Sequence, residues 1–131
     1  MEYTIRLFKP EDMNMLHKWN AAYSEPGPTF DMIPEDSSFV LEANRIPILF
    51  ISMLCTNSKY AYLENYCGDP EFRGLRSDAV QYLIKHLESF AKERGYKFLM
   101  TFAYKPKLVK QFENYGFTKT LEGLTAFIRG I

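Results

Sequence analysis

The chain has 131 residues, of which 47% are hydrophobic and 24% charged, so it is expected to form one folded domain over residues 1–131 and is not of the disordered class. Basic and acidic residues number 16 each, and this zero net charge lacks the basic excess typical of nucleic-acid binders. The longest apolar run, residues 46–55, is far too short to span a bilayer, and the N-terminus has no signal-peptide pattern. We therefore expect a cytoplasmic protein without nucleic-acid or membrane partners.

The first half of the chain predicts one helix and four strands. Alternating apolar residues predict a strand over residues 3–7, and Pro10 followed by two acids predicts the start of a helix that ends before Pro26. Residues 30–33 are interpreted as a short helix or turn. Strands are predicted over residues 39–43, 46–55 and 60–67, with a tight hairpin turn at Asn44 and Arg45.

The second half begins with the clearest element, an amphipathic helix over residues 76–94. Ser77 is its predicted N-cap and Gly95 its C-cap. A strand over 96–103, a helix over 105–115 and a closing hairpin of strands 117–120 and 124–129 follow. This order predicts an α/β fold in which a mixed sheet carries helices on both faces.

The two cysteines, Cys55 and Cys67, lie in different apolar strands without the close spacing of a metal-binding pair. We expect two reduced thiols, no disulfide and no metal site. Neither His17 nor His86 has a position relative to Cys67 that indicates a catalytic dyad, so Cys67 is interpreted as a partly buried thiol.

Three segments between Tyr60 and Phe117 resemble the acyl-CoA-dependent N-acetyltransferases of the GNAT superfamily. Residues 69–74 (DPEFRG) resemble the strand end before the family's pyrophosphate loop, and residues 91–99 (AKERGYKFL) resemble its helix-to-strand junction. Residues 110–117 (KQFENYGF) are similar to a late family segment. The N-terminal Ile5-Arg6 and Glu11-Asp12 pairs are also family-like.

This resemblance implies a GNAT-like fold, with a mostly antiparallel central sheet splayed between the fourth and fifth strands. It also implies transfer of acetyl from acetyl-CoA to an amine by direct attack in a ternary complex. The acceptor would be a small-molecule or protein amine. The alternative is a degenerate GNAT-like module that binds a partner without catalysis.

The resemblance places acetyl-CoA along the fourth strand and at the N-terminus of the following helix, where backbone N–H groups favour phosphate. The residues concerned are Tyr66, Cys67, Gly68, Arg73, Gly74, Leu75, Arg76, Ser77, Asp78, Ala79 and Lys105. The family loop reads R-x-x-G-x-G/A, whereas this chain has Arg76 and Asp78 in place of the two glycines. An ordinary loop before a capped helix is the alternative interpretation.

Acetyl transfer to an amine needs a base for the ammonium and an acid for the leaving thiolate. Glu64 is the candidate base, and a surface carboxylate is the alternative interpretation of it. The family's usual tyrosine aligns with Phe112, which cannot donate a proton. Tyr104 is therefore the candidate acid, with Tyr115 as the other nearby tyrosine.

The acceptor pocket is expected around the first helix, the loop over residues 26–34 and the closing hairpin. Its apolar rim would be formed by Tyr23, Phe30, Met32 and Phe127. Relatives of this kind often pair through their C-terminal strands, so residues 124–131 are a place where a homodimer could form.

Overall fold

The computed structural model describes residues 1–103 and 105–131, and within residues 73–76 it describes the backbone alone. Five strands form one sheet in chain order: β1 (Tyr3–Leu7), β2 (Ser38–Ala43), β3 (Ile46–Cys55), β4 (Tyr60–Gly68) and β5 (Phe98–Thr101). Neighbouring strands are antiparallel except for β4 and β5, which are parallel. The predicted mixed α/β fold is confirmed.

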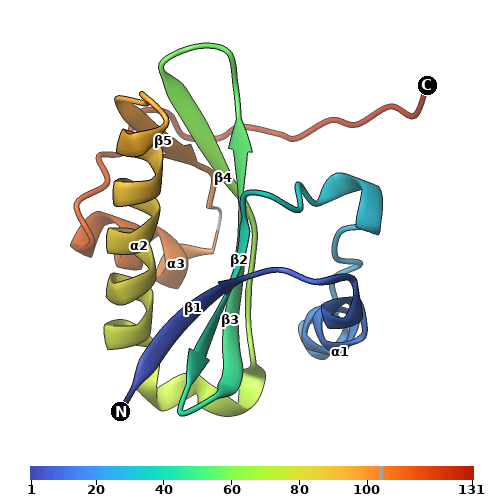
Figure 1. The fold of residues 1–131 in the computed structure, drawn as a ribbon. Helices are drawn as coiled ribbons and strands as arrows, with labels where there is room; N and C mark the ends of the chain where they lie inside the picture. The colour runs from blue at the N-terminus through green and yellow to red at the C-terminus, as the bar shows by residue number, and fades with distance from the viewer. Residues whose placement is uncertain (104) are drawn as a thin grey trace.

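Helices lie on both faces of this sheet (Figure 1). The short 3-10 helix η1 (Pro10–Asp12) leads into α1 (Met13–Ala22) on one face, and η2 (Phe30–Met32) follows it. On the other face lie α2 (Arg76–Glu93), which is preceded by η3 (Pro70–Leu75), and α3 (Pro106–Asn114). Because β4 and β5 are parallel, the connection between them must cross over the sheet, and α2 is that crossover.

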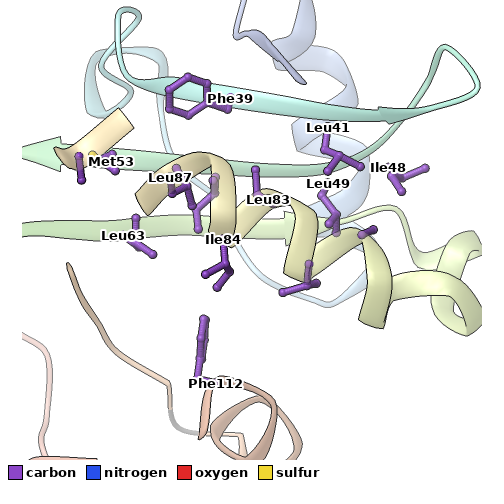
Figure 2. Packing of buried hydrophobic residues seen from close by; sticks show 14 of the residues in the cluster. Phe39, Leu41, Ile48, Leu49, Met53, Leu63, Leu83, Ile84, Leu87 and Phe112 are labelled. Atoms are coloured by element: carbon purple, nitrogen blue, oxygen red, sulfur yellow. The ribbon is translucent and has the colours of Figure 1, made fainter. Parts of the chain in front are cut away.

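The larger core lies between the sheet and α2. Leu83, Ile84 and Leu87 of α2 face the apolar side chains of β2, β3 and β4, and Phe112 approaches from α3 (Figure 2). Leu83 and Leu87 are at most 1% exposed. The helical spacing of these residues explains why α2 forms here, since one continuous apolar stripe covers the sheet.

A smaller core lies on the α1 face. It is formed by the buried residues Phe8, Leu16, Trp19, Ile33, Val40, Phe50 and Cys67. At its edge, the Arg6 guanidinium donates two hydrogen bonds of 2.8 Å to the Asp12 carboxylate and a third, of 3.0 Å, to Glu42. This ion-paired group joins β1, β2 and the start of α1.

Local turn chemistry agrees with the predictions. Asn44 and Arg45 both have positive φ, 50° and 70°, as a tight hairpin turn between right-twisted strands requires. Gly95 has a φ of 84°, and its N–H bonds to the carbonyl of Lys92 while the N–H of Tyr96 bonds to that of Ala91. That pair of bonds is a Schellman cap, so α2 ends where the sequence predicts.

Three predicted elements differ from the structure. Helix α2 begins at Arg76, so Ser77 lies inside its first turn and is not the N-cap. The predicted strand 96–103 is reduced to β5, because Tyr96 is still part of the α2 cap. The closing hairpin is wrong, since no residue from 117 to 131 is in a strand.

The tail extends away from the domain (Figure 1). Apolar alternation in residues 117–131 is compatible with a strand, but a strand also needs a partner to satisfy its backbone groups. The side chains of Leu121, Leu124, Phe127 and Ile128 are 60–92% exposed. Apart from Phe117, which packs against Phe112 of the larger core, the tail therefore contributes little to the two cores described above.

Candidate active site

Strands β4 and β5 pair over only part of their length. The parallel register runs from Tyr60 opposite Phe98 to Leu63 opposite Thr101, where β5 ends. There the Thr101 hydroxyl donates a 3.1 Å hydrogen bond to the carbonyl of Leu63. Strand β4 continues to Gly68, so the two strands part in the middle of the sheet, as the predicted splay requires.

A β-bulge lies in β4 at this point. Phe50 of β3 faces Cys67, and two residues later Ser52 faces Glu64, so two steps along β3 match three along β4. Asn65 has a φ of 60°, and its amide donates a 3.3 Å hydrogen bond to the Ser52 hydroxyl. The bulge bends the strand and changes which side chains face each side of the sheet.

Glu64 lies immediately before the bulge and faces the α1 side. Its neighbour Leu63 belongs to the core under α2, and successive side chains of a strand point to opposite faces. Glu64 is half-buried, and burial raises the pKa of its carboxyl above the ordinary value. A carboxylate made more basic in this way is suited to accept a proton from an ammonium group.

Beyond the bulge, the predicted cofactor residues of β4 point to opposite faces of the sheet. The ring of Tyr66 contacts Phe112 on the α2 side, with centroids 6.4 Å apart. Cys67 is 6% exposed in the core on the α1 side. Gly68 is buried where β4 ends, and the Asp69 N–H bonds to the Ile48 carbonyl at 2.8 Å.

The chain then passes through η3 into the N-terminus of α2, the predicted phosphate site. Ser77 and Asp78 are exposed in the first turn of α2, whereas Ala79 is fully buried in the core. A ligand there would meet only the backbone of Ala79. The predicted side-chain contacts of Arg73, Gly74, Leu75 and Arg76 lie outside the described residues.

The sequence offered two tyrosines as the acid that protonates the leaving thiolate. Tyr104 lies outside the described residues. The Tyr115 hydroxyl donates a 3.2 Å hydrogen bond to the Ser77 carbonyl and lies 3.2 Å from the Ser77 hydroxyl. Tyr115 therefore joins the end of α3 to the first turn of α2.

Phe112, at the position of the family's usual tyrosine, is 7% exposed. Its ring packs against Phe117, with centroids 5.3 Å apart, as well as against Tyr66. The residue therefore fills the core between β4 and α3.

Lys105 lies near residues of the predicted acceptor side. Its ammonium is 3.1 Å from the Glu25 carboxylate and 5.7 Å from the centroid of the Tyr23 ring. This contact joins the start of α3 to the loop after α1 across 80 residues of sequence. Phe30 and Met32 are 42% and 48% exposed on η2, as residues of a pocket rim would be.

A groove of about 560 Å³ lies between α1 and the start of η3. Its polar lining includes three acids, Glu11, Asp69 and Glu71, and one base, Lys18. An acidic surface attracts cations and repels phosphate. The charge of this groove is therefore unfavourable for binding a phosphate group.

An aromatic surface that the sequence did not predict lies beside Glu64. The rings of Tyr60 and Tyr62 on β4 are 5.3 Å apart, and Tyr62 stacks on Phe102, with centroids 6.0 Å apart and planes 11° from parallel. The alternation of Tyr60, Tyr62 and Glu64 is visible in the sequence. The pairing of β4 with β5, which brings in Phe102, is not.

Within residues 1–103 and 105–131, no helix combines the length and apolar character needed to cross a membrane. Nor does this part of the chain contain a cluster of three or more histidine, cysteine or acidic side chains arranged to hold a metal ion.

No protein-family model matches the sequence, and no curated protein matches it significantly. Solved structures do match. The ribosomal-protein-S18-alanine N-acetyltransferase from Escherichia coli is 20% identical, with a TM-score of 0.73 over 92% of this chain and 80% of that one. A predicted acetyltransferase from Clostridium acetobutylicum, solved with acetyl-CoA, is 18% identical, with a TM-score of 0.67 over 96% of each chain.

The structure of AAC(6')-Iy with the bisubstrate analogue CoA-S-monomethyl-acetylneamine is a third match. It is 19% identical, with a TM-score of 0.67 over 98% of this chain and 99% of that one. These likenesses agree with the motifs found in the sequence, and the fold of this chain is that of the GNAT acetyltransferases.

Proposed function

We propose that this protein transfers an acetyl group from acetyl-CoA to an amine acceptor by direct attack in a ternary complex. The observation that carries the proposal is a half-buried carboxylate, Glu64, at the point where β4 bulges and parts from β5. In this arrangement the pantetheine arm enters between the strands and runs along residues 66–68. The pyrophosphate lies at the first turn of α2, where the helix dipole favours it.

The chemistry then needs one base and one acid. Glu64 accepts a proton from the acceptor ammonium, directly or through water. The amine nitrogen attacks the thioester carbonyl carbon, a C–N bond forms and the C–S bond breaks. The CoA thiolate leaves and takes a proton, which Tyr104 would supply. The nitrogen loses its second proton as the amide forms, and Tyr104 regains a proton from solvent. The net products are an N-acetyl amine, CoA and one proton.

Two neighbours with low identity support the choice of substrates without establishing them. One was solved with acetyl-CoA, and the other with an analogue that joins CoA to its acceptor. A covalent analogue of both substrates fits a site that holds the two at once, which is the arrangement proposed here.

The test begins with calorimetric titration of acetyl-CoA, followed by a screen of amine acceptors. Glu64→Gln should bind acetyl-CoA as the native protein does but lower kcat by about a hundredfold, the effect of losing a general base. The native rate should rise with pH through the raised pKa of Glu64, and this dependence should be absent in Glu64→Gln. Glu88→Gln, at an exposed position on α2, is the matched control. Absence of binding at millimolar acetyl-CoA would refute the proposal.

One observation favours the second candidate, a GNAT-like module that binds acyl-CoA or a partner without catalysis. The family's tyrosine position is occupied by Phe112, which is buried between Tyr66 and Phe117 and has no proton to donate. This candidate predicts no turnover across a broad amine panel. CoA release that depends on Glu64 would exclude it.

A further inference from the structure

The α1-side face of β4 and β5 carries a row of aromatic residues next to Glu64. Ala61 and Leu63 of β4 and Leu99 of β5 pack in or against the core under α2. Their alternating neighbours therefore face the opposite side. These neighbours are Tyr60, Tyr62 and Glu64 of β4, together with Phe98 and Met100 of β5 and Phe102, which directly follows it.

This row is open to solvent. Phe98 is 65% exposed and Phe102 56% exposed, and Tyr60 and Tyr62 are only partly buried. Helix α1 covers the other end of the same face, near the end of β4, where Phe50 and Cys67 join its core (Figure 1). Exposed apolar patches often mark binding surfaces, and this one adjoins the half-buried Glu64.

The spacing of Tyr62 and Glu64 along β4 limits the length of a ligand that could contact both side chains. Tyr62 and Glu64 are two residues apart on the same face, which separates their side-chain origins by about 7 Å. Tyr62 and Phe102 are already nearly parallel, so a third flat ring can extend the stack. A ring joined to a primary amine by a short alkyl chain has a length comparable with this spacing along β4.

We infer that the acceptor is an arylalkylamine, whose ring stacks on Tyr62 and Phe102 while its ammonium reaches Glu64. The inference rests on the proposed acetyl transfer and narrows its acceptor. The aromatic rings supply apolar contact and Glu64 supplies the complementary charge. An amine without a ring keeps the ion pair with Glu64 and loses the stacking.

The experiment compares phenethylamine with hexylamine, a flexible amine without a ring. Acetyl transfer is measured by CoA release, and binding of each amine is measured by calorimetry in the presence of CoA. We expect native protein to bind phenethylamine about tenfold more tightly than hexylamine. Tyr62→Ala and Phe102→Ala should remove this preference by raising the KM for phenethylamine about tenfold, with kcat and acetyl-CoA affinity unchanged.

Two further variants test whether Tyr62 and Phe102 act on the amine itself or only through the stability of the fold. Tyr62→Phe keeps the ring and should keep the preference. Tyr82→Ala removes an exposed aromatic residue from α2, away from this face, and should leave both KM values unchanged. The thermal midpoint of every variant is recorded alongside.

Three results would overturn the inference, and they are distinguishable. Equal affinity of native protein for the two amines, with turnover of both, removes the aryl preference and leaves acetyl transfer standing. A fall in the thermal midpoint of Tyr62→Ala without a change in the KM ratio means that the chain itself packs on this surface. Failure to bind acetyl-CoA removes the proposed function and this acceptor together.

Discussion

Replacing Asn65 by alanine or glycine tests whether the bulge in β4 is held by the backbone conformation, by the side chain or by both. Asn65 has a φ of 60°, in the left-handed region that residues other than glycine and asparagine seldom adopt. Its amide also donates to the hydroxyl of the buried Ser52, which accepts a second hydrogen bond, of 2.9 Å, from Ser38. Each replacement removes a different part of this arrangement.

Glycine removes the side-chain hydrogen bond, and its larger entropy loss on folding is offset because it has no β-carbon to strain in the left-handed conformation. That bond is long, at 3.3 Å, so its loss should cost about 1 kcal/mol of unfolding free energy. Alanine loses the same bond, and it tolerates the left-handed conformation less well than asparagine, whose short polar side chain can hydrogen-bond to nearby backbone; this adds about 1 kcal/mol. We therefore expect Asn65→Ala to be destabilised by about 2 kcal/mol and Asn65→Gly by about half as much.

The assay is urea denaturation followed by the fluorescence of Trp19, the only tryptophan, which is buried in the core on the α1 side. The informative quantity is the order of the two variants. At an ordinary strand position alanine is the more stable residue, because glycine loses more entropy on folding. If Asn65→Ala proves as stable as Asn65→Gly, the positive φ does not constrain this strand and the reasoning is wrong.

Three more predictions follow from the same structure. Leu83→Ala should cost about 3 kcal/mol, because the side chain is 1% exposed between α2 and the sheet; a urea-derived loss below about 1 kcal/mol would contradict this packing. Asp12→Asn should cost about 2 kcal/mol at neutral pH. Burial disfavours the ionised Asp12, but the hydrogen bonds from Arg6 and its charge outweigh this and lower the pKa of Asp12 below 3.8. The stabilisation is therefore present above about pH 4 and is lost as the pH falls through the lowered pKa, so wild type and Asp12→Asn should converge in acid in a urea series across pH. Gly95→Ala should lower stability by about 1 kcal/mol through its φ of 84° alone, since no atom lies within 4 Å of the added carbon, whereas Gly130→Ala in the tail should show no change in thermal midpoint.

The sequence by itself determined the elements whose signals are local. The apolar spacing of α2 repeats within every turn, so the helix and its buried face were predictable without its partners. The turn at Asn44 and Arg45 and the cap at Gly95 depend on the backbone preferences of a few adjacent residues. Glu64 could be placed on β4 from strand alternation, and its position among family-like motifs identified it as a candidate base.

Only the tertiary structure decided how these pieces meet. The bulge at Asn65 arises from the register of β4 against β3, and the parting of β4 and β5 arises because β5 ends at Thr101. Lys105 meets Glu25 across 80 residues, and Phe102 reaches Tyr62 through strand pairing. The tail has the alternation of a strand but stays extended and exposed, because alternation encodes which face is apolar and not whether a partner edge is present.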